Sequence, residues 1–222
     1  MTEKTYTGTH EGLDWRLRLE IDEDLMNPRE EHDNLWTLVM KHARRNLGDK
    51  QLSGPEFQEL LDEEKLVPDE NCLVVPIYAY EHGGIAFSLS RTGQFADAFD
   101  AGQIGVGYLP FTKLAEEMGS DDEAARATAI KNLGIELETY GQYIEGDGQG
   151  FVYEVRPAGQ DADDPEGWEE KDSCWGFYGT DPKENGLLEY LPDHVVAVID
   201  PPATPEPTPE TPDVARRRRR TP

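Results

Sequence analysis

Four side chains in the central and C-terminal parts of the chain have the types from which a small ligand site could be built. They are His82, Asp100, Gln103 and Trp175. Histidine is the side chain that titrates near neutral pH, and the glycines beside His82 and Gln103 permit a close approach of backbone to ligand. A cleft that joined the four would suit proton transfer or ligand binding. The alternative is that His82 lies in an exposed turn and Asp100 in an Asx-type turn between strands.

A second group of candidate residues is cationic. His42, Arg44 and Arg45 lie near the end of an expected strand and close to Asp49. Three cations at one strand end could bind an anion or a phosphate group. In a chain this acidic they could equally be internal ion-pair partners, so the sequence leaves both interpretations open.

Several common catalytic patterns are missing. The glycines near Gln103 are not followed by the Gly-Lys-Ser/Thr sequence of a phosphate-binding loop, and they do not form a dinucleotide fingerprint. The two cysteines, Cys72 and Cys174, have no zinc-site spacing and are too few for a disulfide scaffold. A nucleophilic Cys174 would need a histidine base that only the fold could supply. The sequence therefore predicts no metal site, names no cofactor and leaves enzymatic activity uncertain.

The net charge is the most extreme property of the chain. It is −25 overall, and the last 22 residues carry three acids and five arginines, so the first 200 residues carry −27. Such a body repels the phosphates of nucleic acid. We interpret the charge first as a solvated acidic surface, and second as mimicry of DNA directed at a DNA-binding protein. The run Arg216–Arg220 could contact nucleic acid weakly or fold back onto the body.

The segment that must position the candidate residues runs from Cys72 to Tyr108. Residues 73–80 and 85–89 are rich in β-branched and aromatic residues and flank a Gly-Gly turn, and residues 104–108 follow as a third strand. This pattern predicts the middle of an antiparallel sheet. Further strands are expected over 14–22, 150–155 and 173–179, and residues 36–42 favour a strand over a helix.

Helices are indicated at several points between these strands. Ser53 and Pro55 favour a helix start, and residues 111–118 form a second helical region. The longest helix is expected over about 121–144, with Ser120 and Glu123 as a capping box and its apolar stripe facing the sheet. Residues 184–191 suggest a short helix, while residues 195–199 fit either a last strand or an extension of that helix.

These elements predict an α+β fold, a mainly antiparallel sheet covered by one long helix, with short additional helices. We expect a flexible arm over residues 1–13, one domain over 14–200, and a disordered proline-rich tail over 201–222 that ends in the arginine run. The N-terminus has no signal-peptide pattern, and no apolar run is long enough to span a membrane. These features predict a cytoplasmic protein with no membrane partner.

Five ordered blocks between residues 30 and 182 resemble a protein family of tailed bacteriophages and prophages. The blocks are Asp-Asn-Leu with His-Ala-Arg-Arg-Asn-Leu-Gly-Asp (33–49), Pro-Ile-Tyr-Ala-Tyr-Glu-His-Gly-Gly-Ile (76–85), Asp-Ala-Gly-Gln-Ile-Gly (100–105), Glu-Thr-Tyr-Gly-Gln-Tyr-Ile-Glu-Gly-Asp (138–147) and Asp-Ser-Cys-Trp-Gly-Phe-Tyr-Gly (172–179). No activity comes with the resemblance. It implies a phage accessory protein made in the host cytoplasm, and the tail would suit an actinobacteriophage.

Three functions follow as hypotheses. The first is a non-enzymatic accessory protein that binds a host or phage protein, which the resemblance and the missing catalytic patterns favour. The second is a small enzyme or ligand-binding module whose site combines His82, Asp100, Gln103 and Trp175. The third is a DNA mimic, which would need carboxylates in two rows at phosphate-like spacing.

Overall fold

The computed structural model describes residues 3–56, 71–81, 83–90, 101–160 and 166–202. These residues form an α+β fold with two sheets, a four-stranded sheet in the order β1-β2-β8-β9 and a five-stranded sheet in the order β4-β3-β7-β5-β6. The strands are β1 (Lys4–His10), β2 (Leu13–Ile21), β3 (Thr37–Met40), β4 (Lys50–Gln51), β5 (Cys72–Glu81), β6 (Ile85–Ser88), β7 (Ala101–Pro110), β8 (Gly148–Pro157) and β9 (Glu169–Tyr178). The α+β class is confirmed, but two sheets occur where one was expected.

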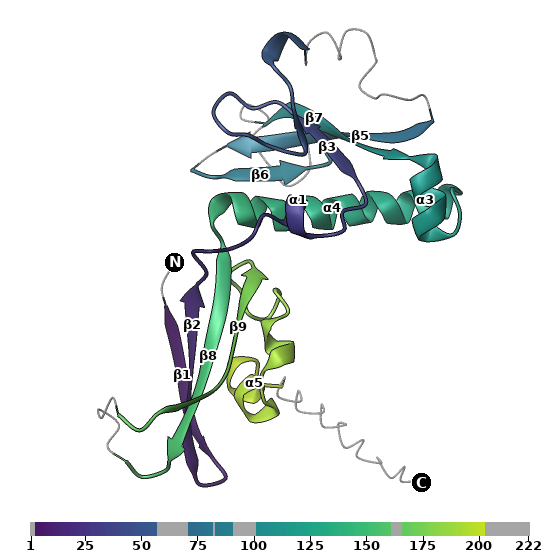
Figure 1. Cartoon of the computed structure of the whole chain (residues 1–222). Helices are drawn as coiled ribbons and strands as arrows, with labels where there is room; N and C mark the ends of the chain where they lie inside the picture. Colours follow the sequence, from purple (N-terminus) through teal and green to yellow (C-terminus); the bar gives the residue numbers. More distant parts are fainter. Residues whose placement is uncertain (1–2, 57–70, 82, 91–100, 161–165, 203–222) are drawn as a thin grey trace, which may run out of the picture.

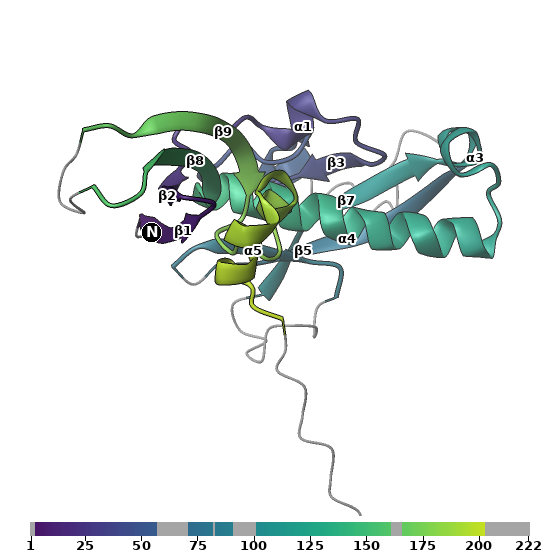
Figure 2. The same ribbon diagram turned by 90° about the horizontal axis from the view of Figure 1, so that it is seen from below.

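The helical elements that the structure describes in full accompany the sheets. They are α1 (Pro28–Glu31), α3 (Phe111–Met118), α4 (Glu123–Glu145), the 3-10 helix η1 (Leu187–Tyr190) and α5 (Asp193–Ile199). The long helix α4 lies lengthwise against the five-stranded sheet, while α5 covers one face of the four-stranded sheet (Figure 1). Figure 2 shows the same arrangement from below. The prediction of one long helix covering a sheet is therefore correct for the five-stranded half.

The central hairpin forms as its sequence predicts. β5 pairs antiparallel with β6 from Tyr78–Ser88 to Glu81–Ile85, and with β7 from Cys72–Pro110 to Tyr80–Ala101. β7 also pairs antiparallel with β3, which confirms a strand over residues 37–40. Glycine is needed in β7, because a Cβ at Gly105 would lie 2.3 Å from the carbonyl oxygen of Val39.

The stripe predicted on the long helix is the face that α4 buries. Ala129, Leu133, Leu137 and Tyr140 lie at three- or four-residue steps and are at most 2% exposed. They pack with Trp36, whose Nε1 donates to the carbonyl of residue 129 at 2.8 Å. The helix begins at residue 123 with the carboxylate of Asp122 as its cap, so the predicted cap at Ser120, two residues earlier, is wrong.

The predicted flexible arm over residues 1–13 is wrong where the structure describes it. Residues 4–10 form β1, which pairs antiparallel with β2 from Lys4–Leu19 to His10–Leu13. The turn between the strands uses Glu11 and Gly12, both with positive φ, as in the two-residue hairpin turns that match the twist of β-strands. The N-terminal segment is thus the edge of the four-stranded sheet.

The C-terminal part differs from the sequence expectation in two places. Residues 193–199 form the helix α5, because Val195 and Ile199, four positions apart, both face the core of the four-stranded sheet. The short helix expected over 184–191 is the single 3-10 turn η1. The predicted tail lies outside the described residues from residue 203 onward, as does most of the helix expected after Ser53.

Candidate functional site

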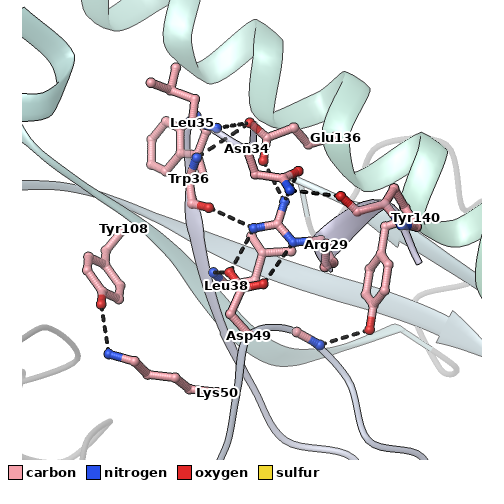
Figure 3. A network of polar contacts seen from close by, with 12 residues as sticks. Arg29, Asn34, Leu35, Trp36, Leu38, Asp49, Lys50, Tyr108, Glu136 and Tyr140 are labelled. Carbon is pink, nitrogen blue, oxygen red and sulfur yellow. Dashed lines mark hydrogen bonds and ion pairs between the residues drawn. The ribbon is translucent and has the colours of Figure 1, made fainter. Parts of the chain in front are cut away.

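The densest polar network joins α1, β3 and α4 around Arg29 (Figure 3). The guanidinium donates to both carboxylate oxygens of Asp49 at 2.9 and 2.7 Å. Its other N–H groups donate, each at 2.7 Å, to Asn34 Oδ1, Glu136 Oε2 and the Trp36 carbonyl. Arginine has five N–H donors, and all five are used here. This network therefore holds the fold together and leaves no guanidinium donor for a ligand.

The charge on Arg29 is well compensated. Its side chain is only 3% exposed. Burial alone lowers the pKa of Arg29, but hydrogen bonds and ion pairs with Asp49 and Glu136 outweigh burial and raise that pKa above its ordinary value. The carboxylates are also fixed by backbone donors, since the N–H of Leu38 donates to Asp49 and that of Leu35 donates to Glu136. No local sequence pattern indicates this network, because its members come from four separate segments.

The predicted anion-binding residues lie together, but each contacts a carboxylate. His42 Nε2 lies 2.6 Å from Glu81 Oε1, and Arg44 lies 3.0 Å from the other oxygen of Glu81. Arg45 pairs with Glu145 at 2.9 Å. The hydrogen bond from His42, followed by the charges of His42 and Arg44, lowers the pKa of Glu81. The structure thus shows the internal ion pairs that were the alternative interpretation, and anion binding stays a prediction.

Two of the four residues of the predicted ligand site lie among the described residues. His82 and Asp100 lie outside the described residues. Gln103 lies in β7 of the five-stranded sheet, where its Nε2 donates to the Gly105 carbonyl at 3.4 Å. Trp175 lies in β9 of the four-stranded sheet. Gln103 and Trp175 therefore belong to different sheets, and a site shared by all four residues stays a prediction.

Trp175 nevertheless lines a surface pocket, which we call the Trp175 pocket. Its cavity volume is about 730 Å³. Ile21, Met26 and Trp175 are 37%, 61% and 45% exposed, so three large apolar side chains that face solvent gather here. The other walls are aromatic or acidic: His32, Tyr178, Asp22, Glu23 and Asp24.

Backbone geometry keeps the indole of Trp175 at the surface. A Cβ built at Gly150 in β8 would lie 2.1 Å from the ring, so the indole covers this glycine closely and any larger residue would displace it. The next residue, Gly176, has φ +91°, a conformation that favours glycine. Its N–H donates to Asp22 Oδ2 at 2.8 Å, which ties the end of β2 to β9. The indole therefore lies over Gly150 while nearly half of its surface remains accessible.

Tyr178 and His32 form a fixed wall of the pocket. The hydroxyl of Tyr178 donates to the Met26 carbonyl at 2.8 Å, and the rings of Tyr178 and His32 meet edge to face at 5.5 Å. Burial, followed by the negative charge of Asp22, raises the pKa of Tyr178. The hydroxyl is therefore a stable neutral donor, and the segment before α1 is held against β9.

The Trp175 pocket can accept an apolar group that ends in a positive charge. An exposed indole attracts a cation over its face, and arginine and lysine combine an aliphatic stem with a charged head. Asp22 is buried and holds backbone N–H groups, whereas Glu23 and Asp24 are exposed at the rim. The sequence selects Trp175 as a candidate, but no pattern in it indicates that these acids lie beside the indole.

Two further clusters of titratable groups lie on the four-stranded half. His10 and His194 stack at 4.0 Å where β1 meets α5, and Tyr153 Oη lies 3.2 Å from His194 Nε2. Burial and then the neighbouring His10 lower the pKa of His194. On the opposite face of the sheet, Glu154 accepts hydrogen bonds from two arginines of β2, which lower its pKa. The His194 cluster thus connects α5 to β1 and β8, and the Glu154 cluster connects β2 to β8.

Comparisons of the chain with models of known protein families, with characterised proteins and with solved structures found no match. In the described parts of the chain, no group of three or more histidine, cysteine, aspartate or glutamate residues is placed to hold a metal ion. None of the described helices is both long and apolar enough to cross a membrane.

Proposed function

We propose that this chain is a non-enzymatic accessory protein of a phage or prophage, which binds a host or phage protein in the cytoplasm of the infected bacterium. The observation that carries the proposal is the Trp175 pocket. Exposed apolar side chains scattered singly over a surface need no explanation, but a group of them rimmed by polar residues marks an interaction site. Ile21, Met26 and Trp175 form such a group.

The composition of the pocket supports a protein partner over a reaction. Tryptophan and methionine are enriched where proteins meet, and tryptophan is among the residues whose truncation costs most binding energy. The cationic side chains that could have bound a substrate already contact carboxylates within the protein: they are Arg29, His42, Arg44 and Arg45. The acidic surface adds long-range attraction for a partner of opposite charge.

The test is affinity capture of partners from a lysate of infected bacteria with matched variants. The wild-type chain is compared with Trp175→Ala and with Asp24→Asn, which removes one rim charge without removing packing. The control is Tyr190→Ala, because Tyr190 is also an exposed aromatic residue, at 58%, but lies outside the pocket. Circular dichroism of each variant establishes that it is folded.

We expect a specific protein to be retained by the wild type and by Tyr190→Ala, lost from Trp175→Ala, and recovered in a smaller amount by Asp24→Asn. A partner that all four proteins retain equally would refute the role of the pocket. If the captured partner is a DNA-binding protein and duplex DNA displaces it, the acidic surface acts as a DNA mimic. The run Arg216–Arg220 is tested separately, through the salt dependence of any DNA binding by the full chain.

A further inference from the structure

Three hollows lie in sequence along the junction between α4 and the two sheets. The first lies between β6 and α4 and has a volume of about 540 Å³. The second lies between α4 and the end of β9 and has a volume of about 490 Å³. The first two share Glu138, Gln142 and Asp147, and the second shares His32 and Tyr178 with the Trp175 pocket. The shared residues place the three hollows next to one another along the junction, and we call the three together the junction groove.

The lining of the junction groove is strongly acidic. Three carboxylates line the first hollow, two further ones the second, and three the Trp175 pocket, which gives eight. The only lysine or arginine among these lining residues is Lys131. Glu138, which lies in both of the first two hollows, and Glu184 are exposed. A positively charged occupant is therefore favoured along the whole groove, beyond the Trp175 pocket alone.

The first hollow also presents a strand edge. Among the described strands, β6 is an edge strand that pairs only with β5. The N–H of Ile85 donates to Glu145 on α4 at 2.9 Å, so it points toward the first hollow, which Glu145 lines. Because successive residues of an antiparallel strand alternate in direction, the backbone groups of Phe87 face the same way, toward the groove. An extended peptide can add to such an edge through backbone hydrogen bonds.

We infer that the junction groove binds an extended segment rich in arginine or lysine, with one cationic side chain placed in the Trp175 pocket. This inference rests on the proposed function and specifies the chemistry of the partner. The aliphatic stem of the cationic residue packs on Met26 and Ile21 while its charged head lies over the indole, beside the carboxylates of Glu23 and Asp24. The remaining cations of the segment lie along Glu138 and Glu184.

The test uses a fluorescein-labelled peptide in which arginine alternates with valine, measured by fluorescence anisotropy against the full chain. The matched peptide carries citrulline in place of arginine, which keeps the shape and removes the charge. Glu138→Gln and Glu184→Gln each remove one groove carboxylate. Glu116→Gln is the control, because Glu116 is an exposed helical glutamate that lines none of the three hollows.

We expect the arginine peptide to bind and the citrulline peptide to bind far more weakly. Each groove substitution should weaken binding by about two- to fivefold, the range measured for exposed ion pairs. Trp175→Ala should weaken it by about two- to thirtyfold, the range for a cation on an indole. Binding should also weaken as salt is added, because exposed charges are screened.

Three results would overturn the inference. The first is equal binding of the citrulline peptide, which would remove the role of charge. The second is an equal loss in Glu116→Gln and Glu138→Gln, which would show attraction to the acidic surface in general. The third is unchanged binding in Trp175→Ala. If the arginine peptide does not bind but capture of a partner from the lysate is lost in Trp175→Ala, the proposed function stands and only the basic chemistry of the partner is refuted. If Trp175→Ala also captures the same partner as the wild type, both the proposed function and this inference are refuted.

Discussion

Replacing Arg29 with alanine should destabilise the protein more than any other single loss of charge described above. Its side chain is 3% exposed, and the carboxylates that it pairs with, Asp49 and Glu136, are 25% and 15% exposed. The substitution removes five hydrogen bonds at once. It also leaves two carboxylates close together without their cation.

The size of the effect follows from burial. Removing one partner of a buried ion pair costs about 3–5 kcal/mol, because the other charge stays buried and uncompensated. Asp49 and Glu136 keep some contact with water and each accepts a backbone N–H, so we expect a loss of about 3 kcal/mol, at the lower end of that range. For a domain of this size such a loss lowers the melting temperature by about 6–12 °C.

The assay is urea unfolding followed by circular dichroism, with Arg45→Ala as the matched control. Arg45 also pairs with a glutamate, but it is 42% exposed, so its removal should cost less than about 1 kcal/mol. Arg29→Lys should fall between wild type and Arg29→Ala, because an ammonium keeps the charge and loses the planar set of donors. Hydrogen exchange should show reduced protection at the Leu38 amide, which donates to Asp49.

Equal unfolding free energies for Arg29→Ala and Arg45→Ala would refute the reasoning. An Arg29→Ala protein more stable than the wild type would refute it too. That result would show that burying the guanidinium costs more free energy than its five hydrogen bonds contribute. Unchanged exchange at Leu38 together with a large loss of stability would place the effect outside this network.

Three further outcomes follow from the geometry. Because the pKa of His194 is lowered in the folded state, the unfolded chain binds more protons, so stability should fall as the pH drops through about 6.5. The urea midpoint of the wild type should therefore be lower at a pH of about 5.5 than at about 7.5. This difference between the two midpoints should shrink in His194→Gln, and shrink less in His10→Gln. Glu154 also has a lowered pKa, so its contribution to folding stability is complete above its ordinary pKa of about 4.5 and is lost as the pH falls below that value. Glu154→Gln should therefore reduce the loss of stability at acid pH. An unchanged loss would contradict this reasoning. Gly105→Ala should cost about 1–3 kcal/mol in urea unfolding because its Cβ would meet backbone at 2.3 Å, whereas Gly102→Ala, with nothing within 4 Å, should be nearly neutral.

The sequence predicted the elements whose signal is local. The hairpin from Cys72 to Ser88 shows β-branched runs around a Gly-Gly turn, and the stripe from Ala129 to Tyr140 has the helical period. Residues 195–199 were ambiguous because a short apolar run fits a strand or a buried helix. Val195 and Ile199, four residues apart, both pack in the core of the four-stranded sheet, as they do in a helix. That shared burial is visible only in the folded sheet and could not be derived from the sequence.

The parts that could not be predicted depend on partners distant in sequence. The prediction of a flexible arm overlooks the alternating threonines of β1 and the Glu11-Gly12 turn, which together are a hairpin signal. No local pattern indicates that β2 pairs with β8 rather than with the central strands. The Trp175 pocket has the same origin, because Met26 and Trp175 are brought together by the pairing of β2 with β8 and of β8 with β9.

The order of the strands has a consequence for how the chain folds as it is synthesised. The four-stranded sheet needs both ends of the described chain, since Leu17 in β2 lies opposite Tyr153 in β8, whereas the strands of the five-stranded sheet and their covering helix all lie between these two residues. Once the chain has left the ribosome as far as the end of α4, all the strands of the five-stranded sheet and their covering helix have been synthesised. The β1–β2 hairpin must wait, with one long edge open, until β8 emerges, and this interval is when the nascent chain is most exposed to wrong pairing.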